Sequence, residues 1–397
     1  MVENKDKKVL NVPNLRFKEF EGEWEKCKLG DITQNFNRRN KEKIQYPMFS
    51  VTNERGFVPQ SEQFEGRDMV GDDVKAYKII QSQEFAYNPA RINVGSIAMY
   101  SGKVPCMISS LYVCFKTTQK VDDEWLMQLL KTAKLNYCYN VNGEGGVRVY
   151  LFYPNFARIR VSLPSLTEQK KIACFLNLLD ERISTQNKII EDLKKLKSAI
   201  IEVHYKQCEK HNVQVADLGE PFNAGNLSKE DLSETGTRCI LYGELFTTYG
   251  EIINEVINHT NTLKGMTLSK KGDLLFPSST TVDAISLIAP SVINVDNVVL
   301  GGDMFGIHID SNYNAQYLSY YFNHIAKRLL AKYAKGSTII HLHYKDIEQA
   351  ELLLPNLDEQ NRMANCLMSL DDKIGVETAF LNLQMCKKNY LLRQMFI

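Results

Sequence analysis

The sequence of 397 residues lacks several features that would assign its class at once. It has no run of 18 or more apolar residues, so no transmembrane helix is expected. Its nine cysteines are scattered and never stand in CxxC spacing, which argues against a disulfide framework and a zinc site. Residues 1–10 are charged and contain no apolar stretch of a secretory signal, so we expect reduced thiols and a cytoplasmic location.

An excess of charge of one sign is missing as well. The chain has 48 Lys and Arg residues and 47 Asp and Glu residues, which gives a net charge of +1. A simple polycationic nucleic-acid binder would be strongly basic, although a neutral total does not exclude a local basic surface. The apolar fraction of 44% is typical of a globular protein, and the length predicts two or three domains.

Catalytic and cofactor motifs are also absent from the sequence. There is no GxxxxGKS/T phosphate loop, no Pro-Asp dipeptide to open a metal-dependent nuclease core and no glycine-rich S-adenosylmethionine loop. The segment 88–91, Asn-Pro-Ala-Arg, carries only half of the motif with which amino-methyltransferases hold a flipped base. His341 and His343 have strand-like spacing without a nearby cluster of Cys, Asp or Glu. We therefore expect no catalytic residue and no metal site.

An internal repeat is the strongest positive signal. The segment Leu163–Gln169, Leu-Pro-Ser-Leu-Thr-Glu-Gln, returns as Leu354–Gln360 at an offset of 191 residues, and ten of 21 positions from Leu163 onward are identical. Fainter similarities at nearly the same offset extend upstream. The chain therefore has the order A–B–A′–B′, which predicts a pseudo-twofold molecule.

The B units are predicted to be long helices. No Gly or Pro occurs between Ser165 and Gln207, and apolar residues recur at 4-3-4 spacing from Ile172 to Ile200. This pattern predicts one helix of about 38 residues with Thr167 as its N-cap. Residues 354–397 repeat the pattern. We expect the two helices to pack as an antiparallel pair; two separate amphipathic helices are the alternative.

The A units are predicted to be α+β domains, because short strand-like runs outnumber helices. Strands are expected at 48–51, 78–80, 84–87, 96–100, 111–115, 273–276 and 284–288, and helices at 123–134 and 315–332. Residues 1–162 hold 24 basic and 19 acidic side chains, whereas residues 208–353 hold 11 and 17. The first A unit is therefore mildly basic and the second acidic.

Several segments together carry a family resemblance: the repeated Leu-Pro-x-Leu-x-Glu-Gln and residues 12–17, 23–25, 29–31 and 87–95. On these segments the chain resembles the specificity subunits of type I restriction–modification systems over essentially its whole length. The resemblance implies two pseudo-twofold-related target-recognition domains at residues 1–162 and 208–353. It also implies a central conserved helix at 163–207 and a C-terminal conserved helix at 354–397, which form an antiparallel coiled-coil spacer.

The resemblance also implies a function. Each recognition domain reads one half of a bipartite, gapped target in double-stranded DNA, and the helices space the half-sites and dock two methyltransferase (M) subunits, which restriction (R) subunits join. S-adenosylmethionine, ATP and Mg²⁺ belong to those partners; this chain binds none of them, is not an enzyme and meets no membrane. A non-catalytic coiled-coil scaffold for proteins is the alternative, and a stand-alone DNA methyltransferase or nuclease is a third reading.

Candidate DNA-contacting residues follow from side-chain chemistry. Arg and Lys read guanine, Asn and Gln read adenine, and Ser and Thr contact bases or phosphates. The candidates in the first recognition domain are Arg38, Arg39, Arg55, Asn88, Arg91, Asn93, Lys103 and Arg148. Those in the second are Ser278, Ser279, Thr280, Lys335, Ser337, Thr338 and His341. For any single one of them, a solvated loop residue is the alternative.

Overall fold

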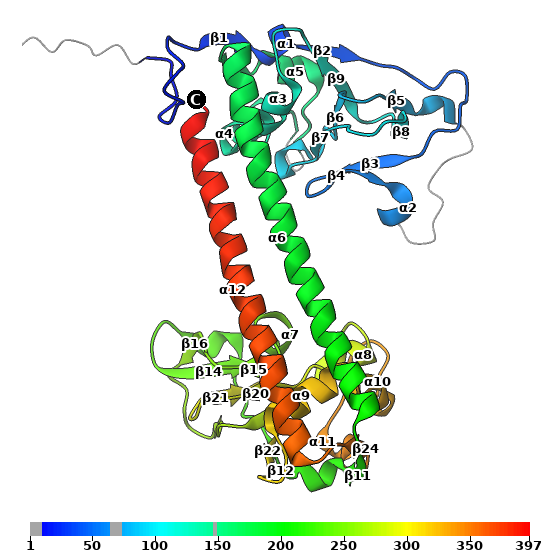
Figure 1. Cartoon of the computed structure of the whole chain (residues 1–397), viewed down its shortest axis with the longest axis vertical. Helices are drawn as coiled ribbons and strands as arrows, with labels where there is room; N and C mark the ends of the chain where they lie inside the picture. The colour runs from blue at the N-terminus through cyan, green and yellow to red at the C-terminus, as the bar shows by residue number, and fades with distance from the viewer. Residues whose placement is uncertain (1–9, 64–73, 146–148) are drawn as a thin grey trace, which may run out of the picture. The chain divides into compact units, whose positions relative to one another are not determined.

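The computed structural model describes residues 10–63, 74–145 and 149–397 (Figure 1). The chain divides into two compact units. The first unit extends to Gln186 and includes Phe380–Ile397, and the second unit is Asn187–Ala379. Each unit contains an α+β domain and parts of two long helices, α6 (Leu166–Gln207) and α12 (Leu357–Met395). The predicted fold class is confirmed.

The first unit is built on an antiparallel sheet with the strand order β2–β9–β6–β7. Its strands are Thr33–Phe36, Val113–Thr117, Phe85–Tyr87 and Ile97–Met99 in that order. Three two-stranded ribbons accompany it: β1–β10 (Glu25–Lys28, Arg160–Leu163), β3–β4 (Phe49–Thr52, Gly56–Pro59) and β5–β8 (Lys78–Ile80, Cys106–Ile108). The expected strands near 48–51, 78–80, 84–87, 96–100 and 111–115 are therefore present.

Short helices complete the first unit around an aromatic core. They are α1 (Leu29–Ile32), α2 (Gln60–Gln63), η1 (Val74–Ala76), η2 (Ile92–Val94), α3 (Asp123–Leu130), α4 (Ala133–Asn142) and α5 (Tyr153–Arg158). Trp125 is fully buried, and Phe85 stacks on Phe115 with ring centroids 4.9 Å apart. The expected helix 123–134 is divided, because Thr132 caps a second helix by accepting from the Leu135 backbone N–H.

The second unit contains two five-stranded sheets. One has the order β12–β22–β18–β20–β15, with strands Gly219–Asn223, Met304–Ile309, Asp273–Pro277, Ser291–Ile293 and Ile252–Ile253. The other has the order β13–β16–β14–β21–β17, with strands Leu232–Ser233, Asn258–Thr260, Thr237–Leu241, Val299–Gly301 and Thr267–Leu268. The ribbons are β11–β24 (His211–Gln214, Glu351–Leu354) and β19–β23 (Ser279–Thr280, Ile340–His341).

The helices of the second unit correct two expectations. They are η3 (Val215–Leu218), η4 (Lys229–Asp231), α7 (Glu244–Thr247), α8 (Ala284–Leu287), α9 (Ala315–His324), α10 (Lys327–Leu330), η5 (Ala331–Tyr333) and α11 (Tyr344–Ile347). The expected strand 284–288 is wrong: Asp283 caps a helical turn there by accepting from the Ser286 backbone N–H at 2.8 Å. The expected helix 315–332 is interrupted after His324, so it is three short helices instead of one.

The long helix α6 confirms the periodicity argument. It has 42 residues, and the apolar positions Ile172, Leu176, Leu179 and Ile190 are buried. The expected N-cap Thr167 is wrong by two residues, since the helix begins at Leu166 and Ser165 Oγ accepts from the Glu168 backbone N–H. Nothing interrupts the helix, because no Gly or Pro lies between its ends.

The glutamine of the repeated Leu-Pro-x-Leu-x-Glu-Gln motif makes equivalent contacts in both units. Gln169 donates to Pro164 O at 2.9 Å and accepts from the Asp122 backbone N–H, which begins α3. Gln360 donates to Pro355 O at 2.8 Å and accepts from the Asn314 backbone N–H, which begins α9. Gln169 therefore anchors the start of α6 to the start of α3, and Gln360 anchors the start of α12 to the start of α9.

The motif glutamates bind different partners. Glu168 accepts two hydrogen bonds from Arg16 at 2.8 Å each and one from Trp24 Nε1 at 3.2 Å. Glu359 lies 2.9 Å from His204 Nε2. The N-terminal residues that carry the family resemblance thus converge on the repeated motif within the first unit.

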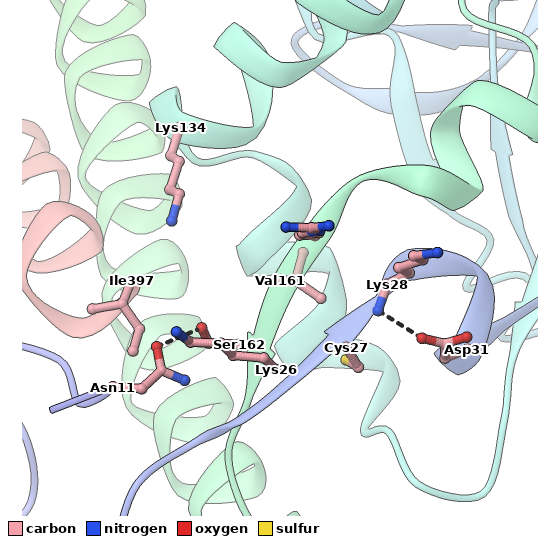
Figure 2. Close-up of a pocket in the computed structure, with 10 residues that line it drawn as sticks. Asn11, Lys26, Cys27, Lys28, Asp31, Lys134, Val161, Ser162 and Ile397 are labelled. Atoms are coloured by element: carbon pink, nitrogen blue, oxygen red, sulfur yellow. Dashed lines mark hydrogen bonds between the residues drawn. The ribbon is translucent and has the colours of Figure 1, made fainter.

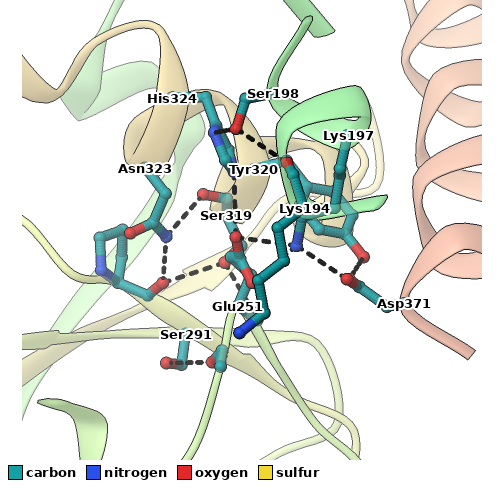
Figure 3. A network of polar contacts seen from close by, with 12 residues as sticks. Lys194, Lys197, Ser198, Glu251, Ser291, Ser319, Tyr320, Asn323, His324 and Asp371 are labelled. Carbon is teal, nitrogen blue, oxygen red and sulfur yellow. Dashed lines mark hydrogen bonds and ion pairs between the residues drawn. The ribbon is translucent and has the colours of Figure 1, made fainter. Parts of the chain in front are cut away.

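A Lys–Asp ion pair joins the two long helices once in each unit, at positions related by the 191-residue offset. In the first unit Lys388 of α12 pairs with Asp180 of α6, which also accepts from Gln128 of α3 at 2.8 Å. In the second unit Lys197 of α6 pairs with Asp371 of α12 at 2.7 Å, and Asp371 also accepts from Tyr320 of α9 at 2.5 Å (Figure 3). In the first unit Arg182 of α6 also lies over the Phe380 ring of α12, and in the second unit His204 of α6 contacts Glu359 of α12. In both units the later residue of α6 contacts the earlier residue of α12, so the helix segments within each unit are antiparallel.

Candidate nucleic-acid interface

The connection between β6 and β7 forms the first candidate reading loop, residues 88–96. The two strands pair antiparallel, so the loop leaves and returns at one end of the sheet. Asn88 Oδ1 accepts from the Ala90 backbone N–H at 3.0 Å, which makes an Asx turn. Gly95 closes the loop with φ at +96°, a value that a side chain would strain. The loop is therefore a defined turn.

Arg91 is the exposed cation of this loop. Its backbone N–H donates to Asn88 O at 3.0 Å, and its carbonyl accepts from the Ser96 backbone N–H at 3.0 Å. Within the described ranges its guanidinium has no hydrogen-bond or ion-pair partner. A guanidinium held on a fixed backbone and free at its end can donate two hydrogen bonds to guanine or to phosphate.

A cavity of about 580 Å³ opens beside this loop. The Leu151 backbone N–H donates to Pro89 O at 3.0 Å, which brings residues 150–152 against the loop. The side chains of Tyr150 and Phe152 stack with their ring centroids 6.3 Å apart. The cavity is lined by Asn88, Pro89, Ala90, Arg91, Leu111, Tyr150 and Phe152. Two of the predicted residues, Asn88 and Arg91, therefore meet at one hollow.

Other candidates of the first domain have partners within the fold. Arg38 makes two hydrogen bonds of 2.8 Å with Glu84, and these hydrogen bonds raise its pKa. Arg55 pairs with Glu62 at 3.0 Å on the surface, and Asn93 donates to Asn140 at 3.0 Å. These contacts fix the side chains and compete with any contact to DNA.

Two further candidates of the first domain, Arg39 and Lys103, are exposed. The predicted contact Arg148 lies outside the described residues. The structure does not bring the seven described first-domain candidates into one group, and the cavity beside the loop is where two of them meet.

In the second unit, the short ribbon β19–β23 joins the two groups of candidates. Ser279 pairs with His341 and Thr280 with Ile340, and the Leu342 backbone N–H donates to Ser278 O at 2.9 Å. Ser278 and Ser279 are buried, whereas Thr280 is half-buried and His341 is exposed. The ribbon thus presents Thr280 and His341 more openly than the two serines.

The turn before β23 holds the last three candidates. Lys335 lies 2.5 Å from Asp346, and this hydrogen bond lowers the pKa of the Asp346 carboxyl. Gly336 has φ at +116°, and Ser337 and Thr338 are exposed after it. The turn therefore offers two exposed hydroxyls, while its lysine is already paired with a carboxylate.

A basic cavity of about 580 Å³ on the first unit was not anticipated from the sequence (Figure 2). Lys26 and Lys28 alternate along β1, Arg160 lies opposite Lys28 on β10, and Lys134 of α4 adds a fourth cation to the lining. Asp31 lies in the same lining and accepts from the Lys28 backbone N–H at 2.8 Å. None of these four cations has an ion-pair partner among the residues that the structure describes. The i, i+2 spacing of the two lysines in a short strand was the available signal, because alternate residues share a face. Such a cavity suits an anionic group.

Neither a metal centre nor a membrane span is found in the described ranges. No group of three or more His, Cys, Asp or Glu residues there is placed to hold a metal ion. No helix in the part of the chain that the structure covers is long and apolar enough to cross a membrane. Burial raises the pKa of the Cys27 thiol to about 11, so this thiol adds no negative charge to the basic cavity at neutral pH.

Comparison with known proteins agrees with the internal repeat. The model of the type I restriction modification DNA specificity domain matches twice, at residues 21–195 and 209–383. The type I restriction enzyme MjaVIII specificity subunit of Methanocaldococcus jannaschii is 23% identical over 399 aligned positions, which cover 91% of this chain and 90% of that protein. A second protein of this organism, assigned to the MjaX enzyme as its specificity subunit, is 22% identical and covers 93% of this chain and 92% of its own length.

Solved structures share the fold. The S subunit of a type I restriction–modification system from M. genitalium superposes with a TM-score of 0.59 at 13% identity, covering 97% of this chain and 99% of that one. A chain from a type I system, solved for its complex assembly and conformational transition, has a TM-score of 0.56 at 14% identity and covers 93% and 96%. The family model covers most of the sequence in two copies, so the chain belongs to the type I restriction modification DNA specificity domain family.

Proposed function

We propose that this chain is the DNA-recognition subunit of a type I restriction–modification complex and is not itself an enzyme. The first recognition domain reads one half of a bipartite, gapped target, and the second domain reads the other half. The double match of the DNA specificity domain carries this proposal. The two candidate regions support it, because the first domain presents polar side chains on the β6–β7 loop, the second presents them on and before the β19–β23 ribbon, and the two sets differ in chemistry.

Phosphate contacts are unequal in the two domains. The basic cavity with Lys26, Lys28, Lys134 and Arg160 offers the first domain a place for the DNA backbone. Residues 208–353 carry six more acidic than basic side chains, so the second domain repels phosphate overall. We therefore assign much of the backbone clamp on the second half-site to the methyltransferase subunits.

The long helices dock the two methyltransferase subunits and set the distance between the half-sites. Exposed apolar residues recur every seven positions on α6, at Ile189, Leu196 and Val203. A seven-residue repeat of exposed apolar side chains is the pattern that receives a partner helix. Restriction subunits join this assembly, and S-adenosylmethionine, ATP and Mg²⁺ are held by the partners in the cytoplasm.

The test is reconstitution with the cognate methyltransferase subunit and S-adenosylmethionine, followed by mapping of methylated adenines. A gapped, bipartite motif is expected. Replacement of residues 208–353 by the same segment of another family member should change one half of the motif and leave the other half unchanged. If the methylated motif stays the same after this replacement, the two-reader arrangement is contradicted. If the chain binds partner proteins without any dependence on DNA, the scaffold alternative is favoured.

A further inference from the structure

A stacked pair of exposed rings occurs at the same position of both repeats. The offset of 191 residues relates Tyr150 to His341 and Phe152 to His343. The Tyr150 and Phe152 rings are 6.3 Å apart with an interplanar angle of 11°. The His341 and His343 rings are 6.2 Å apart with an angle of 19°. The two repeats therefore share the stacked geometry of the ring pair but differ in the chemistry of the rings.

The backbone that carries the rings is also repeated. In the first unit Glu144 and Tyr150 exchange two backbone hydrogen bonds of 2.8 Å. In the second unit Lys335 and His341 exchange two of 2.9 and 2.7 Å. Gly145 and Gly336, which follow Glu144 and Lys335 in the chain, both take a positive φ, +110° and +116°. Each ring pair thus begins at an equivalent backbone bridge.

The residue between the rings orients them outward. Leu151 and Leu342 are fully buried. The Leu151 backbone N–H donates to Pro89 O of the first candidate reading loop, and the Leu342 backbone N–H donates to the carbonyl of Ser278, a candidate of the second domain. Successive side chains of an extended segment point to opposite faces, so the residues on either side of a buried leucine face away from the core. The rings therefore lie on the surface, next to the first candidate reading loop in the first domain and next to Ser278 in the second.

The aromatic pair of the first unit lies beside a third exposed apolar side chain. Tyr150 is 38% and Phe152 48% exposed, and their neighbour Leu111 is 78% exposed. These three line the same cavity as Asn88 and Arg91. Apolar side chains beside hydrogen-bonding ones match the edge of a base pair in the major groove, where the thymine methyl group lies next to polar atoms.

We propose that the two ring pairs are specificity-determining contacts of the two recognition domains. Tyr150 and Phe152 pack against thymine methyl groups in one half-site. His341 and His343 hydrogen-bond to base edges in the other half-site, because an imidazole has both donor and acceptor positions. This inference rests on the proposed function and adds the residues through which one scaffold reads two different sequences.

The test uses the complex with the cognate methyltransferase subunit and a library of randomised half-sites. The double variant Y150A/F152A should lose preference by about tenfold or more at one or two base pairs of one half-site. The double variant H341A/H343A should do the same in the other half-site only. Matched controls are Tyr137→Ala on α4 and His211→Ala on β11, which remove exposed side chains outside the two loops.

A second variant, which exchanges the aromatic rings of the first domain for those of the second, keeps the test valid if the alanine variants fail to fold. Y150H/F152H places in the first domain the rings that the equivalent positions of the second domain already hold, so it should fold and should alter the base preferred instead of abolishing methylation. A thermal melt checks folding of every variant. An unchanged motif in the folded double variants overturns the proposal, as does a uniform loss at all sequences. If the wild-type complex gives no gapped motif, the proposed function fails instead.

Discussion

The ion network around Lys197 in the second unit allows a quantitative prediction. The Lys197 side chain is only 8% exposed and lies 3.1 Å from Glu251 and 2.7 Å from Asp371 (Figure 3). Removal of one partner of a buried ion pair costs about 3–5 kcal/mol. In Lys197→Met, Glu251 keeps a 3.0 Å contact with His324, and Asp371 keeps its hydrogen bond from Tyr320. We therefore expect a loss of about 3 kcal/mol, the low end of that range.

The pH dependence of the same network has a defined sign. Burial by itself would raise the pKa of Glu251, but the hydrogen bond from His324 and the charge of Lys197 outweigh it and lower this pKa from 4.5 to about 2. A depressed carboxyl pKa contributes stability above the ordinary value, and that contribution is lost as the pH falls from about 4.5 to about 2. The difference corresponds to about 3 kcal/mol at 1.36 kcal/mol per pH unit.

Urea denaturation of the full chain, followed by far-UV circular dichroism, measures this loss. Both tryptophans, Trp24 and Trp125, lie in the first unit, so their fluorescence provides an internal reference that Lys197→Met should leave nearly unchanged. The matched controls are Lys195→Met, which removes a side chain 76% exposed, and Lys388→Met at the equivalent position of the repeat. Asp180, the partner of Lys388, is 42% exposed, so about 1 kcal/mol is expected there.

Two results would refute this reasoning. If Lys197→Met is no more destabilising than Lys195→Met, the buried network contributes nothing to the stability of the second unit. If the variant loses stability but retains the wild-type decline between pH 4.5 and pH 2, Lys197 does not hold the pKa of Glu251 down, and the loss has another origin.

Three further outcomes can be checked on the reconstituted complex. Arg91→Ala should relax recognition in one half-site by about 1–3 kcal/mol, seen in the methylation motif; equal weakening of both halves would make Arg91 a phosphate or folding residue. Leu196→Glu places a charge in the exposed heptad row and should reduce co-purification of the methyltransferase subunit while the melting temperature stays unchanged; intact assembly would exclude this row as the docking surface. The double variant K26A/R160A should lower the slope of log affinity against log salt by about 2 without changing the motif; an unchanged slope would show that the basic cavity meets no phosphate.

The sequence allowed the two long helices to be predicted because their signals are local. The seam from Ile172 onward and the absence of Gly and Pro specify α6 almost to its ends. Polar position 197 interrupts that seam in the sequence, yet Lys197 is buried. Its partner Glu251 lies 54 residues further along the chain, so no local pattern could reveal the ion pair.

The β structure and the site depended on distant pairings. The strand β14 pairs in parallel with β21, whose residues lie about 60 positions later, and short apolar runs do not encode such a partner. The run 284–288 was apolar enough for a strand, but a single capping side chain, Asp283, made it helical. Arg38 remains a predicted DNA contact, although the structure gives it Glu84 as a partner.

The Lys–Asp exchange between α6 and α12 has a consequence for the evolution of the target. Lys197 of the first repeat pairs with Asp371 of the second, and Lys388 of the second repeat pairs with Asp180 of the first. Such a reciprocal exchange of equivalent contacts is what the interface of a symmetric homodimer shows. A homodimer of one repeat would present two identical readers and could recognise only a palindrome. Because both repeats are joined in one polypeptide, the readers are free to diverge, as their opposite net charges already record.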